Sequence, residues 1–587
     1  MVEHPLTPEP QKSVVESRRR SDWTFFLVAV GLLLVLNFVA SRYFFRLDLT
    51  EDKRYTISDQ TKKLLGALKE PVQVTVYLEG EFPAGFRRLQ NSTREMLEEF
   101  RLYSDGNIQY QFVDPSANTN EQARNQFYAQ LAQKGLQPTN LFAQEGDKKV
   151  EKIVFPGAII SAGTKETAAI LLKGSQAAPP EERLNQSIEG LEYELASAVR
   201  KVASASAGRI GILQGHGELW LPQAADFLGT LSEFYTVNRV QLSQVPDLNN
   251  FNLVVLMKPT QPFSELDKYK MDQFLIRGGK LLFLLDGVRA SLDSLSEEGA
   301  LAFPYDLNLQ DMLFRYGVRV NPDLVQDLNA SFIPMVTGYM GNQPQTQLVP
   351  WRFYPLITNF SDLPMTRNLD AVQTKFVSSI DTVKAVGIKK SPLLWTSQYS
   401  RKRESPVSIS LNDPRVDRDP KLFSQNAIPV GYLLEGKFQS VFKNRPVPEG
   451  SSIPFQAEGK ASQVVVFSDG DLGANEVDPR TGRPLELGFD RFTRSRFANK
   501  ELLKNVADYL LDEKGLIELR GKEIKLRPLD KAKLRDERTK WQAINLGVPL
   551  VLLLLFGVVK FWLRKRKYAR SFPDQGNPSG PDLAGAP

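Results

Sequence analysis

Two apolar runs lie near the ends of the chain, and the long region between them alternates between the periods of strands and helices. The runs extend from Trp23 to Ala40 and from Trp541 to Leu563. Each is close to the ~20 residues that a helix needs to cross the ~30 Å hydrocarbon core of a bilayer. The pattern predicts transmembrane helices over residues 23–41 and 541–563, with tails at 1–22 and 564–587.

Each run has an alternative interpretation. Three arginines (residues 18–20) precede the first run, as in a cleaved signal peptide, but the apolar stretch is longer than a typical signal core. The second run is also compatible with a buried core helix. Basic residues in both tails favour cytoplasmic tails. We therefore expect an inner (cytoplasmic) membrane protein with two spans, in which the region from Arg42 to Lys540 lies in the periplasm.

Between Thr56 and Val202 the pattern predicts strands and helices in the order βαβαββα. Residues 72–78 alternate with period two, as strands do, and residues 86–100 follow helical spacing. This order is that of a thioredoxin-like fold, which we expect over residues 46–203. The chain contains no cysteine, so the CxxC pair of a redox enzyme is missing and the domain is predicted to be a scaffold.

A small-residue linker, Ala203–Gly208, precedes a second alternating pattern. Lys280–Leu285 is a continuous apolar run of the kind expected of a strand buried on both faces of a parallel sheet. Gln463–Phe467 repeats this pattern much later in the chain. We predict a doubly wound (flavodoxin-like) α/β domain over residues 208–512. It would carry an insertion of mixed strands and loops at 321–460 and be followed by a membrane-proximal stalk at 513–540.

Polar side chains follow three of the predicted strands of this second domain. They are His216, Glu218, Asp286, Asp469 and Asp471. In open parallel sheets ligands bind beyond the carboxyl ends of the strands, so these residues are predicted to converge as a contact site for a ligand or partner. Glycines on both sides of His216 suit a close backbone approach. The alternative is that these segments are simply tight turns and helix caps.

Composition excludes several classes of function. A net charge of +6 over 587 residues leaves no basic stripe of the kind that binds nucleic acid. Two histidines and no cysteine exclude a multi-histidine zinc site and thiolate chemistry. The sequence has no GxSxG elbow and no GxxxxGK[ST] phosphate-binding loop. We therefore predict no catalytic residue, cofactor or metal, and any ATP hydrolysis would belong to another subunit.

Several segments carry a family resemblance. They are Arg46–Ser58 (RLDLTEDKRYTIS), Val76–Leu78, Gly80–Phe86, Gly215–Glu218 (GHGE), Gly278–Gly287 (GGKLLFLLDG) and Ser468–Asp471 (SDGD). Together they resemble the GldG family of membrane-anchored auxiliary components of ABC transporters associated with gliding motility. The resemblance implies an ABC permease and a cytoplasmic ATPase as partners, and a link to gliding and to protein secretion. It implies no catalytic residues.

The sequence therefore predicts a non-enzymatic periplasmic auxiliary subunit that two helices anchor beside a transporter. An alternative is a periplasmic ligand-binding or hydrolytic module that uses the His216/Glu218 turn. A polysaccharide chain-length regulator shares the two-span layout, but the alternating strands and helices argue against the long coiled coil that such a protein needs.

Overall fold

The computed structural model describes residues 12–42, 57–117, 119–145, 148–172, 179–203, 208–295, 299–341, 343–367, 369–413, 419–511 and 537–568. The chain divides into two units, Met1–Glu523 and Ile524–Pro587. Residues 1–11 and 569–587 of the predicted tails, and nearly all of the predicted stalk, lie outside the described residues.

Helices cover both apolar runs. In the second unit, α12 (Arg538–Tyr568) contains the segment Thr539–Arg566, which is long and apolar enough to cross a membrane. In the first unit, α1 (Lys12–Arg42) contains a shorter apolar segment, Trp23–Phe38. Among the described residues, α12 is thus the one helix that has the length and composition of a membrane span.

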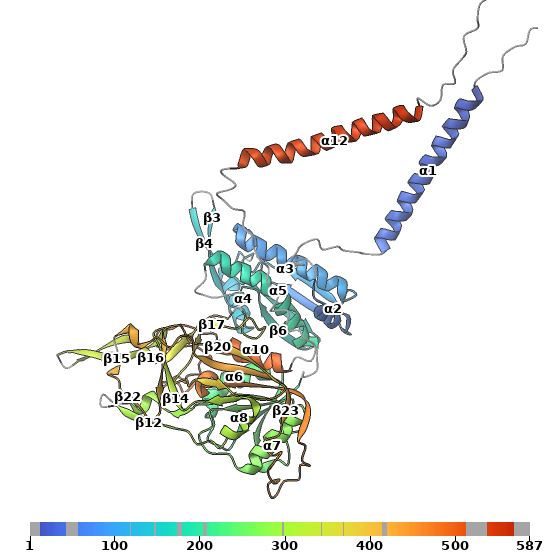
Figure 1. The fold of residues 1–587 in the computed structure, drawn as a ribbon. Helices are drawn as coiled ribbons and strands as arrows, with labels where there is room; N and C mark the ends of the chain where they lie inside the picture. Colours follow the sequence, from blue (N-terminus) through green and yellow to red (C-terminus); the bar gives the residue numbers. More distant parts are fainter. Residues whose placement is uncertain are drawn as a thin grey trace, which may run out of the picture. The chain divides into compact units, whose positions relative to one another are not determined.

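The first folded domain is a four-stranded sheet with helices packed against it (Figure 1). Its elements are α2 (Asp59–Gly66), β1 (Val72–Val76), α3 (Ala84–Tyr103), β2 (Ile108–Phe112), α4 (Glu121–Gln133), β3 (Thr139–Glu145), β4 (Lys148–Val154), β5 (Gly157–Ala162), β6 (Lys165–Ile170) and α5 (Pro180–Ala203). The strand order is β2-β1-β5-β6, in which β1 and β2 are parallel and β5 is antiparallel to both of its neighbours.

Local sequence explains how several of these elements begin and end. The hydroxyl of Ser58 accepts a hydrogen bond from the backbone N–H of Thr61 and so caps α2, as Ser and Thr side chains commonly do. Pro156 separates β4 from β5, because a proline cannot donate to the ladder. The hairpin of β3 and β4 is an addition to the predicted βαβαββα order.

The second domain is built on an eight-stranded sheet. Five of its strands are parallel, in the order β8-β7-β9-β10-β24, and β23, β20 and β17 extend the sheet as antiparallel strands. These strands are β7 (Arg209–Gln214), β8 (Thr236–Gln241), β9 (Leu253–Met257), β10 (Lys280–Leu284), β17 (Asn359–Phe360), β20 (Ile388–Trp395), β23 (Pro429–Gln439) and β24 (Glu458–Phe467). The two predicted buried strands, Lys280–Leu285 and Gln463–Phe467, correspond to β10 and to the second half of β24.

Helices cover both faces of this sheet (Figure 1). On one face α6 (Leu221–Ser232) and α10 (Asn499–Leu511) pack against alternate strand residues in one apolar core. On the other face α7 (Glu265–Ile276) and α8 (Gln310–Tyr316) pack against the intervening residues in a second core. Burial on both faces explains why β9 and β10 read as uninterrupted apolar runs.

The region predicted as an unassigned insertion folds mostly into short strands around a separate apolar core. It and the segment before it contain β11 (Val288–Arg289), β12 (Ala300–Pro304), β13 (Val318–Val320), β14 (Asp323–Asp327), β15 (Ala330–Met340), β16 (Gln343–Ile357), β18 (Val372–Gln373), β19 (Ile380–Thr382), β21 (Ser400–Glu404) and β22 (Val407–Ile409). Three strands of the same region, β17, β20 and β23, join the main sheet instead.

Candidate functional site

Four parallel strands that are neighbours in the sheet end at one edge. In spatial order they are β24, β10, β9 and β7. Asp469 follows β24, Asp286 follows β10, Lys258 follows β9, and His216 follows β7. This edge is where doubly wound sheets bind their ligands, and it gathers all five residues that the sequence singled out.

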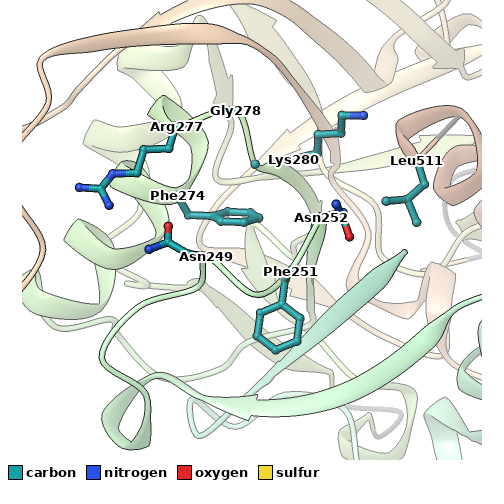
Figure 2. A pocket seen from close by; sticks show the side chains of 9 residues that line it. Asn249, Phe251, Asn252, Phe274, Arg277, Gly278, Lys280 and Leu511 are labelled. Carbon is teal, nitrogen blue, oxygen red and sulfur yellow. The ribbon is translucent and has the colours of Figure 1, made fainter. Parts of the chain in front are cut away.

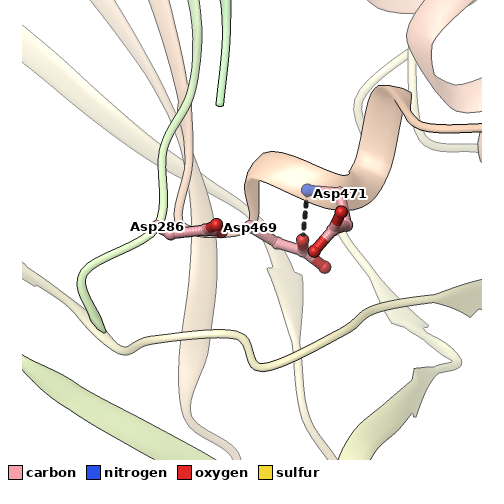
Figure 3. A group of neighbouring side chains, drawn as sticks. All are labelled: Asp286, Asp469 and Asp471. Atoms are coloured by element: carbon pink, nitrogen blue, oxygen red, sulfur yellow. Dashed lines mark hydrogen bonds between the residues drawn. The ribbon is translucent and has the colours of Figure 1, made fainter. Parts of the chain in front are cut away.

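Three carboxylates converge here, and we call Asp286, Asp469 and Asp471 the aspartate cluster (Figure 3). One oxygen from each lies within 4.8 Å of the others. Asp286 accepts a hydrogen bond of 2.6 Å from the backbone N–H of Gly470, and Asp469 accepts one of 2.8 Å from that of Lys375. Asp469 also accepts a hydrogen bond of 2.7 Å from the backbone N–H of Asp471, which is the dashed line in Figure 3. Asp286 and Asp469 are buried.

Lys258, which the sequence pattern did not single out, supplies a positive charge to this cluster. Its Nζ lies 2.5 Å from Oδ2 of Asp471 and 3.5 Å from Oδ2 of Asp286. The backbone of Lys258 has φ 51°, unusual for a residue with a side chain. A Cβ at position 470 would lie 2.7 Å from Cγ of Lys258, so Gly470 is required for this close approach.

The electrostatics of the cluster follow from burial and from this one ammonium. Burial acts to lower the pKa of Lys258, but Asp471 and Asp286 outweigh it and raise that pKa. Burial raises the pKa of Asp286 to about 6 against the opposing effect of Lys258, and it raises the pKa of Asp469 well above its usual range. Lys258 is therefore charged at neutral pH and is neither a nucleophile nor a base. A divalent cation would have to compete with its ammonium for the same carboxylates.

The second group surrounds the turn Gly215–Glu218, which we call the histidine turn. The His216 ring places Nε2 3.4 Å from Asp267 and Nδ1 3.5 Å from Glu218. It stacks on Phe263 with ring centres 3.8 Å apart and planes 16° apart. Glu218 also accepts a hydrogen bond of 2.8 Å from the backbone N–H of His216. The turn is thus tied to the first turn of α7, which contains Asp267.

These contacts set the protonation of the histidine. Burial lowers the pKa of His216, but the contacts with Asp267 and Glu218 outweigh this and raise it to about 9. The pKa values of Glu218 and Asp267 are lowered by His216, although burial opposes that change. At neutral pH the ring is an imidazolium between two carboxylates, and a protonated ring cannot act as a general base.

The glycine that follows His216 has the role that the sequence suggested. Gly217 has φ 73°, and a Cβ at this position would lie 2.1 Å from Oγ1 of Thr260. Thr260 in turn donates a hydrogen bond of 3.0 Å to the carbonyl of Gly217. A side chain at position 217 would therefore displace the hydroxyl of Thr260 and would also be strained by the positive φ.

The predicted site residues converge in two separate groups, the aspartate cluster and the histidine turn. In the part of the chain that the structure describes, no hydrogen bond or ion pair joins His216 or Glu218 to the aspartate cluster. Lys258 and Asp267 complete the two groups, and Lys258 was detectable because it directly follows an apolar strand at the same edge. The prediction that the five residues contact a ligand stays a prediction.

A pocket lies at the opposite edge of the sheet, where β9 and β10 begin (Figure 2). It has a volume of about 210 Å³, below the ~300–1,000 Å³ typical of small-molecule sites. Its lining is Asn249, Phe251, Asn252, Phe274, Arg277, Gly278, Gly279, Lys280 and Leu511. None of the predicted site residues lines it.

Comparison with known proteins relates this chain to transport systems. Residues 207–506, just over half of the chain, match the auxiliary-domain family described as "ABC-type uncharacterized transport system". Residues 51–161 match a domain of unknown function. A Borreliella burgdorferi protein, named only as an uncharacterized protein, is 22% identical over 550 residues, which are 89% of this chain and 94% of that protein.

Among solved structures, the mmIFT52 N-terminal domain is similar at 12% identity and a TM-score of 0.29. That similarity covers 51% of this chain and 97% of the solved one. The match over residues 207–506 includes every residue of the aspartate cluster and the histidine turn. The chain belongs to the ABC-type uncharacterized transport system family.

Proposed function

We propose that this protein is a non-enzymatic, membrane-anchored auxiliary subunit of an ABC transporter complex. The observation that carries this proposal is the internal pairing at the sheet edge where a ligand or catalytic site would lie. Lys258 pairs with Asp286 and Asp471 of the aspartate cluster, and His216 is held as an imidazolium between Glu218 and Asp267. Groups paired in this way hold loops together and leave no activated nucleophile or base, which fits a protein that works by contact.

The proposed topology has two spans and a periplasmic body. The length and hydropathy of α12 support one span, and the apolar segment Trp23–Phe38 of α1 supports the other when the flanking apolar residues of the sequence are included. Basic residues in both tails support a cytoplasmic location for the tails. The protein would therefore lie in the inner membrane with residues 42–540 outside the cytoplasm.

The finer assignment follows the resemblance to the GldG family. We infer an ABC permease and a cytoplasmic ATPase as partners, in a complex linked to gliding motility and protein secretion. The strand order β2-β1-β5-β6 supports a thioredoxin-like first domain, and the parallel order β8-β7-β9-β10-β24 supports a flavodoxin-like second domain. Both would act as scaffolds that receive or relay a partner.

A second candidate is a ligand-binding or hydrolytic module at the His216/Glu218 turn. One observation favours a contact there: Trp220, two residues after Glu218, is 65% exposed. Exposed tryptophans are common anchors of binding interfaces. In this version His216 and Glu218 would shape the contact beside Trp220, and Asp286, Asp469 and Asp471 would contribute from the other loops at the same end of the sheet.

Purification tests the main proposal. An affinity-tagged full chain is extracted from its own membranes in mild detergent, and copurifying proteins are identified by mass spectrometry. We expect a multi-span permease and an ATPase in amounts comparable to the chain. A second variant, Trp220→Ala, tests whether the histidine turn makes the contact. Loss of both partners in that variant would favour a contact at the histidine turn. Recovery of neither partner with the wild-type chain would contradict the main proposal.

A further inference from the structure

The helix α12 continues past the end of its apolar run. The sequence places that end at Leu563, whereas the helix extends to Tyr568 as one continuous element (Figure 1). Arg564, Lys565 and Arg566, which we call the basic collar, therefore belong to the helix, and all three are exposed. Successive residues of an α-helix point about 100° apart, since a turn takes 3.6 residues. The collar is thus a ring of positive charge around the helix and not a stripe along one side.

The helix supplies no carboxylate for the basic collar. From Arg538 to Pro573 the sequence contains no Asp and no Glu. The other end of α12 differs, because Nζ of Lys540 lies 3.7 Å from a carboxylate oxygen of Glu537. That carboxylate also accepts a hydrogen bond of 2.9 Å from the indole N–H of Trp541. The charge of the collar therefore has to be balanced by groups outside the helix.

The position of the collar along α12 determines what surrounds it when the helix crosses a membrane. Trp541 and Trp562 are separated by about 31 Å along the axis at 1.5 Å per residue, which matches the ~30 Å hydrocarbon core. Tryptophans are enriched at both boundaries of that core. The guanidinium carbon of Arg566 lies 4.8 Å from the ring centre of Trp562. The collar starts two residues beyond Trp562 and so lies at the depth of the lipid headgroups.

We propose that the basic collar binds the headgroups of anionic phospholipids. This inference rests on the proposed function, because it requires α12 to cross the membrane. Lipid headgroups surround a helix on all sides, as the collar does, whereas a protein partner approaches from one side. Basic clusters directly beyond a transmembrane helix attract anionic lipids, by about fivefold in binding for each Lys or Arg. Lys560, one turn before Arg564, adds a further charge whose long side chain reaches toward the same level.

Two general effects also favour cations at this end of α12. Cations near a helix C-terminus are stabilised by the helix dipole, and cations in short cytoplasmic segments set the orientation of a span. Both effects depend on charge, but neither distinguishes one lipid headgroup from another. Selectivity for an anionic over a zwitterionic lipid is therefore the property that separates a lipid site from these effects.

The test measures which lipid stays bound to the full tagged chain purified in mild detergent. Dioleoylphosphatidylglycerol or dioleoylphosphatidylcholine is added, and native mass spectrometry counts the retained lipids. We expect the wild type to prefer phosphatidylglycerol. The triple variant Arg564→Gln, Lys565→Gln, Arg566→Gln should bind phosphatidylglycerol roughly a hundredfold more weakly, at about fivefold for each cation removed.

A matched control removes the same charge from the second folded domain. Lys384, Lys421 and Lys437 are exposed there, so the triple change of these lysines to Gln should leave the preference for phosphatidylglycerol as in the wild type. A charge-preserving variant, Arg564→Lys with Arg566→Lys, should also keep it, because the attraction depends on charge. Labelling of Ser571→Cys in each variant checks that the orientation of α12 is unchanged.

Two results would overturn the inference alone. One is equal retention of the two lipids by the wild type, and the other is phosphatidylglycerol binding that the triple variant of the collar leaves unchanged. If that variant also lost the permease or the ATPase, a protein would cover the collar in place of lipid. Copurification of both partners with the wild-type chain tests the proposed function separately. Labelling of Ser571→Cys in intact spheroplasts would overturn the proposed topology together with this inference.

Discussion

The hydroxyl of Tyr193 donates a hydrogen bond of 3.0 Å to Oδ2 of Asp508, and this contact joins α5 of the first domain to α10 of the second. Asp508 is buried. Its carboxylate also accepts a hydrogen bond of 2.6 Å from the hydroxyl of Tyr235 and one of 2.9 Å from Nζ of Lys504. Burial acts to raise the pKa of Asp508, but Lys504 and Arg200 outweigh it and hold that pKa below its usual range. The carboxylate is thus the shared acceptor between the domains.

Asp508→Ala should destabilise the protein by about 3–5 kcal/mol, because it leaves two buried hydroxyls and the partly exposed ammonium of Lys504 without their acceptor. The matched control is Tyr193→Phe, which removes one hydrogen bond and should cost about 1 kcal/mol. Thermal unfolding of the full chain in detergent measures both. Equal melting temperatures for Asp508→Ala and the wild type would show that the carboxylate does not join the domains.

Lys258→Met should destabilise the protein in a pH-dependent way. Without the ammonium the buried carboxylates repel one another, and their protonation relieves the repulsion. A buried carboxyl with a raised pKa, such as Asp286 at about 6, binds protons more readily in the folded than in the unfolded state, so stability falls as pH rises through that range. We expect a deficit of several kcal/mol at pH 8 that shrinks at pH 5, measured by thermal melts. A deficit independent of pH would contradict this account of the cluster.

The features of the fold and of the candidate site that could be predicted are those that adjacent residues in the sequence determine. The strand Lys280–Leu285 and the turn at Gly217 were predicted because burial on two faces and a close backbone approach leave marks in adjacent residues. The gathering of Asp286, Asp469 and Asp471 followed from a general rule for parallel strands. Lys258 was missed because a lysine beside a proline reads as a solvated loop residue.

The insertion was beyond prediction for a different reason. β20 and β23 are antiparallel additions to the main sheet, and nothing in their own sequences specifies β24 as the neighbour of β23. Such strand pairing joins residues far apart in the sequence, and it depends on which apolar face remains to be covered. The pairing of His216 with Asp267 is non-local in the same way, since α7 brings Asp267 to the turn.

The imidazole of His216 should titrate well above its ordinary range. Its pKa of about 9 exceeds the usual 6.5, so the stabilisation from its charge is complete below about pH 6.5 and is lost as pH rises through 9. The carboxylates Glu218 and Asp267 contribute above about pH 4.5 and lose their contribution in more acidic solution. Allowing for partial exposure of the ring, the histidine contributes about 2 kcal/mol.

Histidine-selective NMR on the His4→Gln chain leaves one ring to follow, because the sequence has two histidines. Glu218→Gln should lower the titration midpoint of that ring. A wild-type midpoint at or below 6.5 would mean that the two carboxylates do not hold the ring as an imidazolium.

Topology can be read with single cysteines, because the chain has none of its own. Thr164 and Ser243 are exposed in the two folded domains, so Thr164→Cys and Ser243→Cys should react with a membrane-impermeant thiol reagent in intact spheroplasts. Ser571→Cys, in the C-terminal tail, should react only after the membrane is permeabilised. The opposite labelling pattern would show that the orientation is the reverse of the proposed one. Labelling of all three cysteines in intact spheroplasts would show that one of the two proposed spans does not cross the membrane.

The most direct test of an auxiliary, non-enzymatic role is to follow ATP hydrolysis through the separation of the complex. The sequence has no GxxxxGK[ST] phosphate-binding loop, and the proposed function assigns ATP hydrolysis to a partner. We predict ATPase activity in the complex purified in mild detergent and none in the chain once harsher detergent has removed the permease and the ATPase. Activity that stays with the isolated chain, in proportion to its amount, would contradict the account.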